Sequence, residues 1–282
     1  MNKYEILLST GSVPWFGLER ASNYAHKIEY DSLEFLPLRQ FVRQAKQAIR
    51  IYKADWLNHL PGLETVQSIH QSWVLDNDLE RKHGLEPRTF DKVLRLLLFP
   101  KVNDSREVVA AVSAARQAPV VIHDIPPEWT SDSQRKEFAG GLLFEISSHQ
   151  TRSPEEIKKW LEETKHNLVA DTRDDQSIVW AREKLKLKEW QDFWRWVGFE
   201  NIKSIQLTLI GKQGMNDILN HQETLAEQQF LWLNKQGWNG PVTVEVNPLT
   251  LFMGTRGKIG KGLAEIGVFV RKTLDEGKPW SG

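Results

Sequence analysis

The most constraining feature of the sequence is a regular alternation of short apolar runs with longer segments of helical period. Buried parallel strands are nearly continuous in apolar residues, because helices cover both faces of the sheet. Eight runs fit this pattern, at intervals that leave room for helices: Glu5–Thr10, Ser32–Pro37, Thr65–His70, Val120–Ile125, Leu142–Ser147, Asn167–Asp171, Ser204–Ile210 and Val242–Asn247. Eight strand–helix units favour a parallel sheet that closes into a (β/α)8 TIM barrel.

The segments between these runs carry helix signals. Ser153 is a capping residue, Pro154 fits the first helical position, and the acids that follow face the positive end of the helix dipole. The segment 188–199 is rich in tryptophan, and its aromatic residues recur at helical spacing. We expect this helix to pack aromatic bulk on the barrel, with a base-stacking platform as the alternative.

An open, doubly wound sheet is the rival architecture. Its dinucleotide-binding form places a Gly-x-Gly-x-x-Gly loop after the first strand, and no such loop is present here. A barrel of this kind uses about 250 residues as one domain, so the 282 residues predict a single domain over 1–282. The segment Gln71–Pro87 after the third run is polar and irregular, which fits an active-site lid or a plain surface excursion.

Composition limits the function classes. The chain has 37 acidic and 37 basic residues, and this balance disfavours a nucleic-acid binder, which usually has a basic excess. It has no cysteine, which excludes disulfides and thiolate metal sites. No apolar run approaches about 18 residues and no secretory signal pattern opens the chain, so we expect a cytoplasmic protein without membrane contact.

Ionisable residues stand at the ends of most of the predicted strands. Barrel interiors are filled mainly by branched apolar side chains, so charged groups at these positions call for a reason. Closure of the sheet would aim them at one place, where crowded carboxylates need a cation or a proton. Carboxylates with imidazoles or amides nearby suit Mn²⁺ or Mg²⁺, or else Zn²⁺. Taken singly, such a Glu can pair with an arginine and such a His can be a hydrogen-bonded core residue. The residues are Glu34, His70, His123, Asp124, Glu145, Asp171 and Glu245.

The order of these segments resembles the xylose-isomerase-like barrels, the superfamily of sugar isomerases, sugar epimerases and the endonuclease IV type of abasic-site nuclease. The resemblance spans nearly the whole chain through short motifs. The matching segments are Asp31–Phe35, similar to "dgvEl", Ser68–His70, similar to "slH", Val121–His123, Leu143–Glu145, Asp171–Asp174, similar to "DtgH", and Val244–Val246.

The resemblance implies a divalent metal held by Glu145, Asp171 and Glu245, with Gln206 as a fourth ligand. It also implies that Glu145 and Glu245 are the paired acids that move the proton in the epimerase branch, tuned by raised pKa values. Glu34, His70 and His123 would then position the substrate or complete the site.

Two departures from the family pattern bear on the metal. Gln206 stands where the seventh strand normally offers a metal-binding histidine, and Asp174 replaces the histidine of "DtgH". An amide oxygen ligates a hard cation more weakly than an imidazole and brings no charge. The nuclease branch uses a histidine-rich site, so these losses count most against a nuclease.

Two glycine- and lysine-rich segments follow the seventh and eighth strands, where barrels of this kind commonly bind phosphate. They are 211–214, with Lys212, and 254–262, with Lys258. Backbone N–H groups beside glycine can approach an anion closely, so both segments fit loops that bind a phosphorylated substrate. Flexible, soluble connectors are the alternative.

Three functions remain open on the sequence. The first is a metal-assisted isomerase or epimerase of a small sugar or sugar-like hydroxycarbonyl compound. The second is a barrel that has lost catalysis and serves as a binding or scaffold protein. The third, which the charge balance and the few histidines disfavour, is a nuclease acting on abasic DNA. An oligomer is compatible with each.

Overall fold

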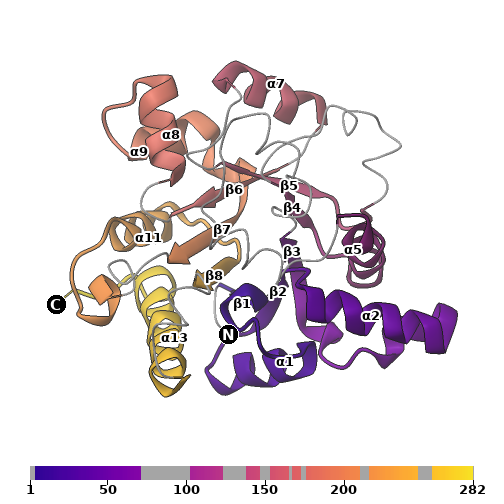
Figure 1. Ribbon diagram of the computed structural model, residues 1–282. Helices are drawn as coiled ribbons and strands as arrows, with labels where there is room; N and C mark the ends of the chain where they lie inside the picture. The colour runs from indigo at the N-terminus through magenta and orange to yellow at the C-terminus, as the bar shows by residue number, and fades with distance from the viewer. Residues whose placement is uncertain are drawn as a thin grey trace, which may run out of the picture.

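The computed structural model is a closed barrel of eight parallel strands, paired in chain order, with β8 returning to β1 (Figure 1). The structure describes residues 4–70, 102–122, 138–146, 153–164, 167–172, 176–209, 216–246 and 256–281. The prediction of a (β/α)8 barrel is confirmed, and the open-sheet rival is wrong. The strands are β1 Ile6–Ser9, β2 Ser32–Phe35, β3 Val66–His70, β4 Val120–Ile122, β5 Leu142–Ile146, β6 Asn167–Asp171, β7 Ile202–Leu209 and β8 Val242–Val246.

Helices surround the strands on the outside (Figure 1). The predicted lid Gln71–Pro87 lies outside the described residues. None of the described helices is long and apolar enough to cross a membrane. The helices are α1 Leu18–Lys27, α2 Arg39–Tyr52, α5 Val102–Arg116, α7 Pro154–Thr164, α8 Gln176–Leu185, α9 Gln191–Val197, α11 Leu225–Gln236 and α13 Arg256–Val270, with short turns η1 Thr10–Ser12, η2 Lys53–His59, η3 Leu63–Thr65, η6 Phe199–Asn201 and η7 Arg271–Asp275.

Two of the predicted helix features are confirmed. The Ser153 Oγ accepts from the Glu156 N–H at 3.2 Å, and the Glu156 carboxylate accepts from the Ser153 N–H at 2.7 Å, a reciprocal cap at the start of α7. The aromatic face of α9 is buried, with Phe193 and Trp194 fully covered. Trp194 lies beside Trp232 of α11, so this aromatic set packs between helices.

The segment 254–262 was predicted to be a loop. This prediction is wrong from Arg256 onward, because α13 begins there. Glycine inside a helix normally lowers the stability of the helix, so its presence in α13 needs an explanation. Close packing against neighbouring side chains provides one. A Cβ on Gly260 would lie 2.7 Å from the Tyr24 hydroxyl oxygen, and one on Gly267 would lie 3.0 Å from the ring of Tyr30. These glycines let α13 approach the aromatic residues of α1 and of the turn after it.

The strands separate two different cores. Outward-facing strand residues belong to one large apolar cluster with the helices. Inside the barrel a second, small cluster contains only Val121, Leu143 and Val169, from β4, β5 and β6. Register partners lie on the same face of a sheet: Val121 of β4 pairs with Leu143 of β5, whereas Val169 of β6 pairs with Glu145 of β5. Other interior positions hold polar side chains, among them Glu34, His70 and Gln206.

Two register shifts set which side chains enter the interior. Between β2 and β3 the pairing steps from Leu33–Val66 to Glu34–Ser68, so β3 has one extra residue, the exposed Gln67. The same step occurs between β6 and β7, where Lys203 is the extra residue. One extra residue reverses which face later side chains occupy. The shifts thereby turn the following polar residues of β3 and β7 toward the barrel axis.

Candidate active site inside the barrel

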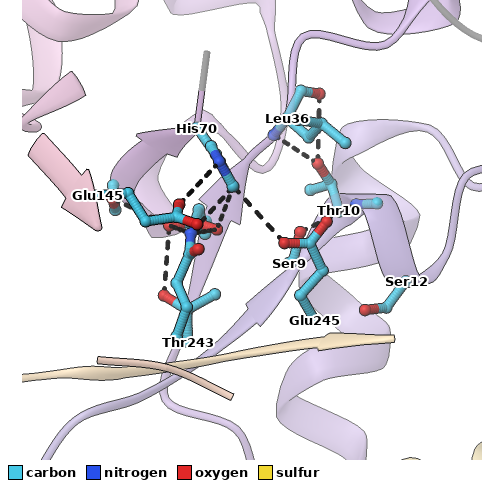
Figure 2. A network of polar contacts seen from close by, with 12 residues as sticks. Ser9, Thr10, Ser12, Leu36, His70, Glu145, Thr243 and Glu245 are labelled. Atoms are coloured by element: carbon cyan, nitrogen blue, oxygen red, sulfur yellow. Dashed lines mark hydrogen bonds and ion pairs between the residues drawn. The ribbon is translucent and has the colours of Figure 1, made fainter. Parts of the chain in front are cut away.

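His70, at the end of β3, lies at the centre of three carboxylates. Its Nε2 is 3.3 Å from Glu145 Oε2, and its Nδ1 is 3.5 Å from Glu34 Oε1 and 3.6 Å from Glu245 Oε2. Figure 2 shows the ring with Glu145 on one side and Glu245 on the other. The four residues come from β3, β5, β2 and β8, so closure of the sheet is what brings them together.

These carboxylates control the protonation of the ring. Burial alone lowers the pKa of His70, because it disfavours the charged form, but hydrogen bonds to the three carboxylates raise it and outweigh burial. The pKa of His70 is therefore raised well above 6.5. The imidazolium is the cation that balances the crowded carboxylates when no metal is bound.

Glu34 is the most enclosed of the three acids, with 1% of its surface exposed. Its Oε2 accepts from Ser68 Oγ at 3.2 Å and from Thr243 Oγ1 at 3.3 Å, and its Oε1 accepts from Gln206 Nε2 at 3.3 Å. These donors come from β3, β8 and β7. A buried carboxylate with several donors is fixed in position, so Glu34 is a rigid part of the site.

Gln206 reaches across the barrel from β7 and has one unsatisfied atom. Its Nε2 lies 2.9 Å from His70 Nδ1, while its Oε1 is buried with no hydrogen-bond partner among the described residues. The amide nitrogen can donate to Nδ1 only while that nitrogen carries no proton. When Nδ1 is occupied by a cation, half a turn of the amide would place its oxygen there instead.

The turn η1, which follows β1, lies beside Glu245 (Figure 2). Ser12 Oγ accepts from the N–H of Val246 at 2.8 Å, which ties this turn to β8. A Cβ on Gly11 would lie 3.6 Å from Glu245 Oε1 and 2.8 Å from the side chain of Leu36. The turn therefore packs closely against the carboxylate that is the most exposed of the three, at 13% of its side chain.

The predicted site residues divide into three groups. Glu34, His70, Glu145, Gln206 and Glu245 are brought together, as described above. Asp171 is buried at the end of β6 and pairs in register with Gln206, at the edge of this group. The third group is not placed at the site by the structure. His123 and Lys212 lie outside the described residues, and Lys258 falls in the first turn of α13.

The residues fit a divalent cation, although not in the arrangement that the resemblance implies. Within the described ranges, one group of three His, Asp or Glu residues has ligand atoms within 4.8 Å of one another, and it is Glu34, His70 and Glu245. Glu145, Asp171 and Glu245 form no such group there. The unsatisfied Gln206 Oε1 beside the observed group is a further oxygen donor. The ligand set Glu145, Asp171, Gln206 and Glu245 stays a prediction.

Sequence reasoning missed Ser68 and Thr243, which hold Glu34. A signal was present in the strand period. Ser68 precedes His70 by two residues and Thr243 precedes Glu245 by two, so each shares a strand face with a predicted site residue. A polar residue two positions before a strand-end acid or histidine indicates that the polar site continues into the barrel.

Comparison with known proteins identifies the fold. No protein-family model matches the sequence, and neither does any curated protein. Among solved structures, a xylose isomerase domain containing protein from Salmonella typhimurium LT2 aligns over 96% of this chain and 98% of its own, with 14% identity and a TM-score of 0.55. A 3-keto-D-glucoside 4-epimerase from E. coli aligns over 94% and 99%, with 11% identity and a TM-score of 0.50. The chain therefore has the xylose-isomerase-like TIM barrel fold.

A third similar structure places this fold inside a larger chain. It is a fusion of a xylose isomerase-like TIM barrel with a 4-hydroxyphenylpyruvate dioxygenase, with 12% identity and a TM-score of 0.50. The alignment covers 96% of the present chain and 43% of the fusion protein.

Proposed function

We propose that this barrel is an isomerase or epimerase of a small sugar or sugar-like hydroxycarbonyl compound. The observation that carries the proposal is the placement of Glu145 and Glu245 on opposite nitrogens of the buried His70. Two carboxylates on opposite sides of one imidazole can approach a small bound substrate from two directions. The similar fold of a 3-keto-D-glucoside 4-epimerase supports the substrate class.

The chemistry needs one acid and one base. One of the two glutamates takes the proton from the carbon next to the substrate carbonyl, and the electrons of that C–H bond move toward the carbonyl oxygen to give an enediolate. Return of a proton to the former carbonyl carbon, while the proton of the neighbouring hydroxyl passes to the former carbonyl oxygen, gives the isomer. Return of a proton to the opposite face of the first carbon gives the epimer. His70 holds both carboxylates in place through its two ring nitrogens.

A divalent ion bound beside these residues would polarise the carbonyl and its neighbouring hydroxyl. Glu245 belongs to both ligand sets considered above, whereas Asp171 and Glu34 each belong to one. The residues of this chain orient the substrate and transfer the proton in either case. Lys212 and Lys258 remain candidates for a phosphate group on the substrate.

Proton exchange tests the proposal without knowledge of the exact sugar. The protein, loaded in turn with Mg²⁺, Mn²⁺ or Zn²⁺, is incubated with a panel of aldoses, ketoses, ketoglycosides and their phosphates in deuterated water. We expect NMR to show deuterium at the carbon next to the carbonyl of at least one compound. Glu145→Gln and Glu245→Gln should each slow this exchange by about 10² to 10⁴-fold, since each removes an acid–base group.

The alternatives give different results. No exchange with any panel compound, together with sugar binding that Glu145→Gln and Glu245→Gln leave unchanged, would support a binding or scaffold protein. Incision of an abasic-site duplex at ordinary salt would support the nuclease. Either result would overturn the proposed isomerase.

A further inference from the structure

The geometry points to a cation site formed by Glu34, His70 and Glu245, with the amide oxygen of Gln206 as a fourth ligand. This inference rests on the proposed function and assigns its metal to β2, β3, β7 and β8. The resemblance instead places the metal on β5 to β8, through Glu145, Asp171, Gln206 and Glu245. The two sites differ in named residues, so they can be told apart.

The distances fit a shared cation. Ligands about 2.0–2.2 Å from one ion lie about 3.0–3.4 Å from each other, depending on the coordination geometry. His70 Nδ1 lies 3.5 Å from Glu34 Oε1 and 3.6 Å from Glu245 Oε2, and the Gln206 amide lies 2.9 Å from the same nitrogen. Shifts of a few tenths of an ångström would place these atoms around one ion.

The Gln206 amide gives independent support. Its Oε1 is buried and has no partner among the described residues, although a buried amide oxygen normally accepts a hydrogen bond. Rotation of the amide by half a turn exchanges its oxygen and nitrogen. The oxygen would then point toward His70 Nδ1 and Glu34 Oε1, where a cation would use it.

The surrounding residues form the support that metal ligands usually have. His70 Nε2 contacts Glu145 Oε2 at 3.3 Å, which holds the ring proton on Nε2 and leaves the Nδ1 lone pair for the ion. Ser68 Oγ and Thr243 Oγ1 both donate to Glu34 Oε2, which leaves Oε1 facing His70. Glu145 thus orients the ligand and remains available for proton transfer.

Manganese titration of matched variants tests the assignment. Isothermal calorimetry measures Mn²⁺ binding to the metal-free full chain. We expect Glu34→Gln, an isosteric change, and His70→Gln each to weaken binding by at least about tenfold. Asp171→Asn is the control, and it should leave the Mn²⁺ affinity unchanged. Loss of binding in Asp171→Asn with normal binding in Glu34→Gln would overturn the inference and leave the proposed isomerase standing.

A spectroscopic measurement on the wild-type chain tests the same assignment without depending on whether a variant folds. Pulsed electron paramagnetic resonance of bound Mn²⁺ should detect a directly coordinated imidazole nitrogen, which the ligand set Glu145, Asp171, Gln206 and Glu245 lacks. The coupling should persist in His123→Gln. Its absence from the wild-type chain, or its loss in His123→Gln alone, would overturn the assignment. Wild-type protein that binds no Mn²⁺ would overturn both this site and the metal in the proposed function.

Discussion

The barrel interior contains two groups of side chains that differ in chemistry: an apolar half formed by Val121, Leu143 and Val169, and a polar half around His70 that includes Glu145 of β5. On the β4–β6 side, Val121, Leu143 and Val169 contact one another and need no hydrogen-bond partners. On the β2, β3, β7 and β8 side, Glu34 is surrounded by hydroxyl and amide donors. The apolar half is stable through burial alone, whereas each group of the polar half depends on its neighbours for partners.

The difference shows how one barrel can support both stability and chemistry. The Glu34 carboxylate can be buried beside His70 because β3, β7 and β8 supply hydrogen-bond donors to it. The apolar half contributes packing between side chains that need no such donors. The unsatisfied Gln206 Oε1 is the exception in the polar half. With the amide rotated by half a turn, either a proton on His70 Nδ1 or a cation bound there would give this oxygen a partner.

The largest effect should come from Glu34→Leu, which puts an apolar residue in the polar half. Ser68, Thr243 and Gln206 would lose their acceptor, and His70 would lose one of its three carboxylates. Removing one partner of a buried charged pair costs about 3–5 kcal/mol. We expect a loss of that size in the free energy of unfolding, measured by urea denaturation of the metal-free protein.

Glu34→Gln is the control for this change, because it keeps the size and one acceptor oxygen, and it should cost clearly less. A Glu34→Leu variant as stable as the wild type would mean that the polar half does not depend on this carboxylate.

A reciprocal pair of isosteric changes compares the halves directly. Thr243→Val removes a hydroxyl that donates to Glu34, and Val169→Thr adds a hydroxyl to the apolar cluster, beside the register partners Glu145 and Ser204. Thr243→Val should lower the free energy of unfolding by about 1–3 kcal/mol through loss of a hydrogen bond to a charged group, and Val169→Thr should cost less because the neighbouring Glu145 can accept from the added hydroxyl. Chemical denaturation of both variants in one buffer gives the comparison. A Val169→Thr variant that loses as much stability as Thr243→Val would show that the added hydroxyl finds no partner beside Glu145.

The polar half should also make stability depend on pH. The folded pKa of His70 is raised above 6.5, so the folded chain holds a proton that the unfolded chain releases as the pH passes about 6.5. This contribution is fully present below that pH and is lost as the pH rises toward the folded pKa. The slope is at most about 1.4 kcal/mol per pH unit for one proton.

Urea denaturation at a series of pH values, with a chelator present, measures this dependence. The His70→Gln variant should have a flatter curve above pH 6.5. An identical curve in the two proteins would assign the dependence to other groups.

The smallest effect should come from a change outside the barrel, which serves as a baseline. Ser153→Ala removes the hydroxyl that accepts from the Glu156 N–H at the start of α7. Loss of such a cap costs about 1 kcal/mol. Thermal unfolding should show this small loss with no change in Mn²⁺ binding. A change in Mn²⁺ binding would mean that the site is sensitive to general loss of stability.

Much of the fold could be predicted from the sequence, because buried parallel strands carry a direct signal in their apolar runs. Asn167–Asp171 has the predicted bounds, and β4, β5 and β8 begin at the predicted residues. Within the described ranges, β1, β2, β3 and β7 differ from the prediction by one or two residues at an end. The helical start of 256–262 was missed because glycine usually indicates a loop. Only the packing against Tyr24 and Tyr30 accounts for glycine there.

The site was harder to predict because it depends on two register shifts. Strict alternation from Val66 would place Ser68 and His70 on the same face as Val66, toward the helices. The extra residue Gln67 reverses that face, and nothing in the local sequence marks it as extra. The donors around Glu34 come from strands far apart in the chain, so their contacts follow only from the closed barrel.

The central claim is that residues from four strands meet at one cation-binding centre inside the barrel. Anomalous scattering from crystals soaked in Mn²⁺ tests it most directly. We expect one strong peak about 2.0–2.3 Å from Glu34, His70 Nδ1 and Glu245. A peak held by Glu145 and Asp171 instead, or carboxylates of Glu34 and Glu245 that point away from His70, would contradict it.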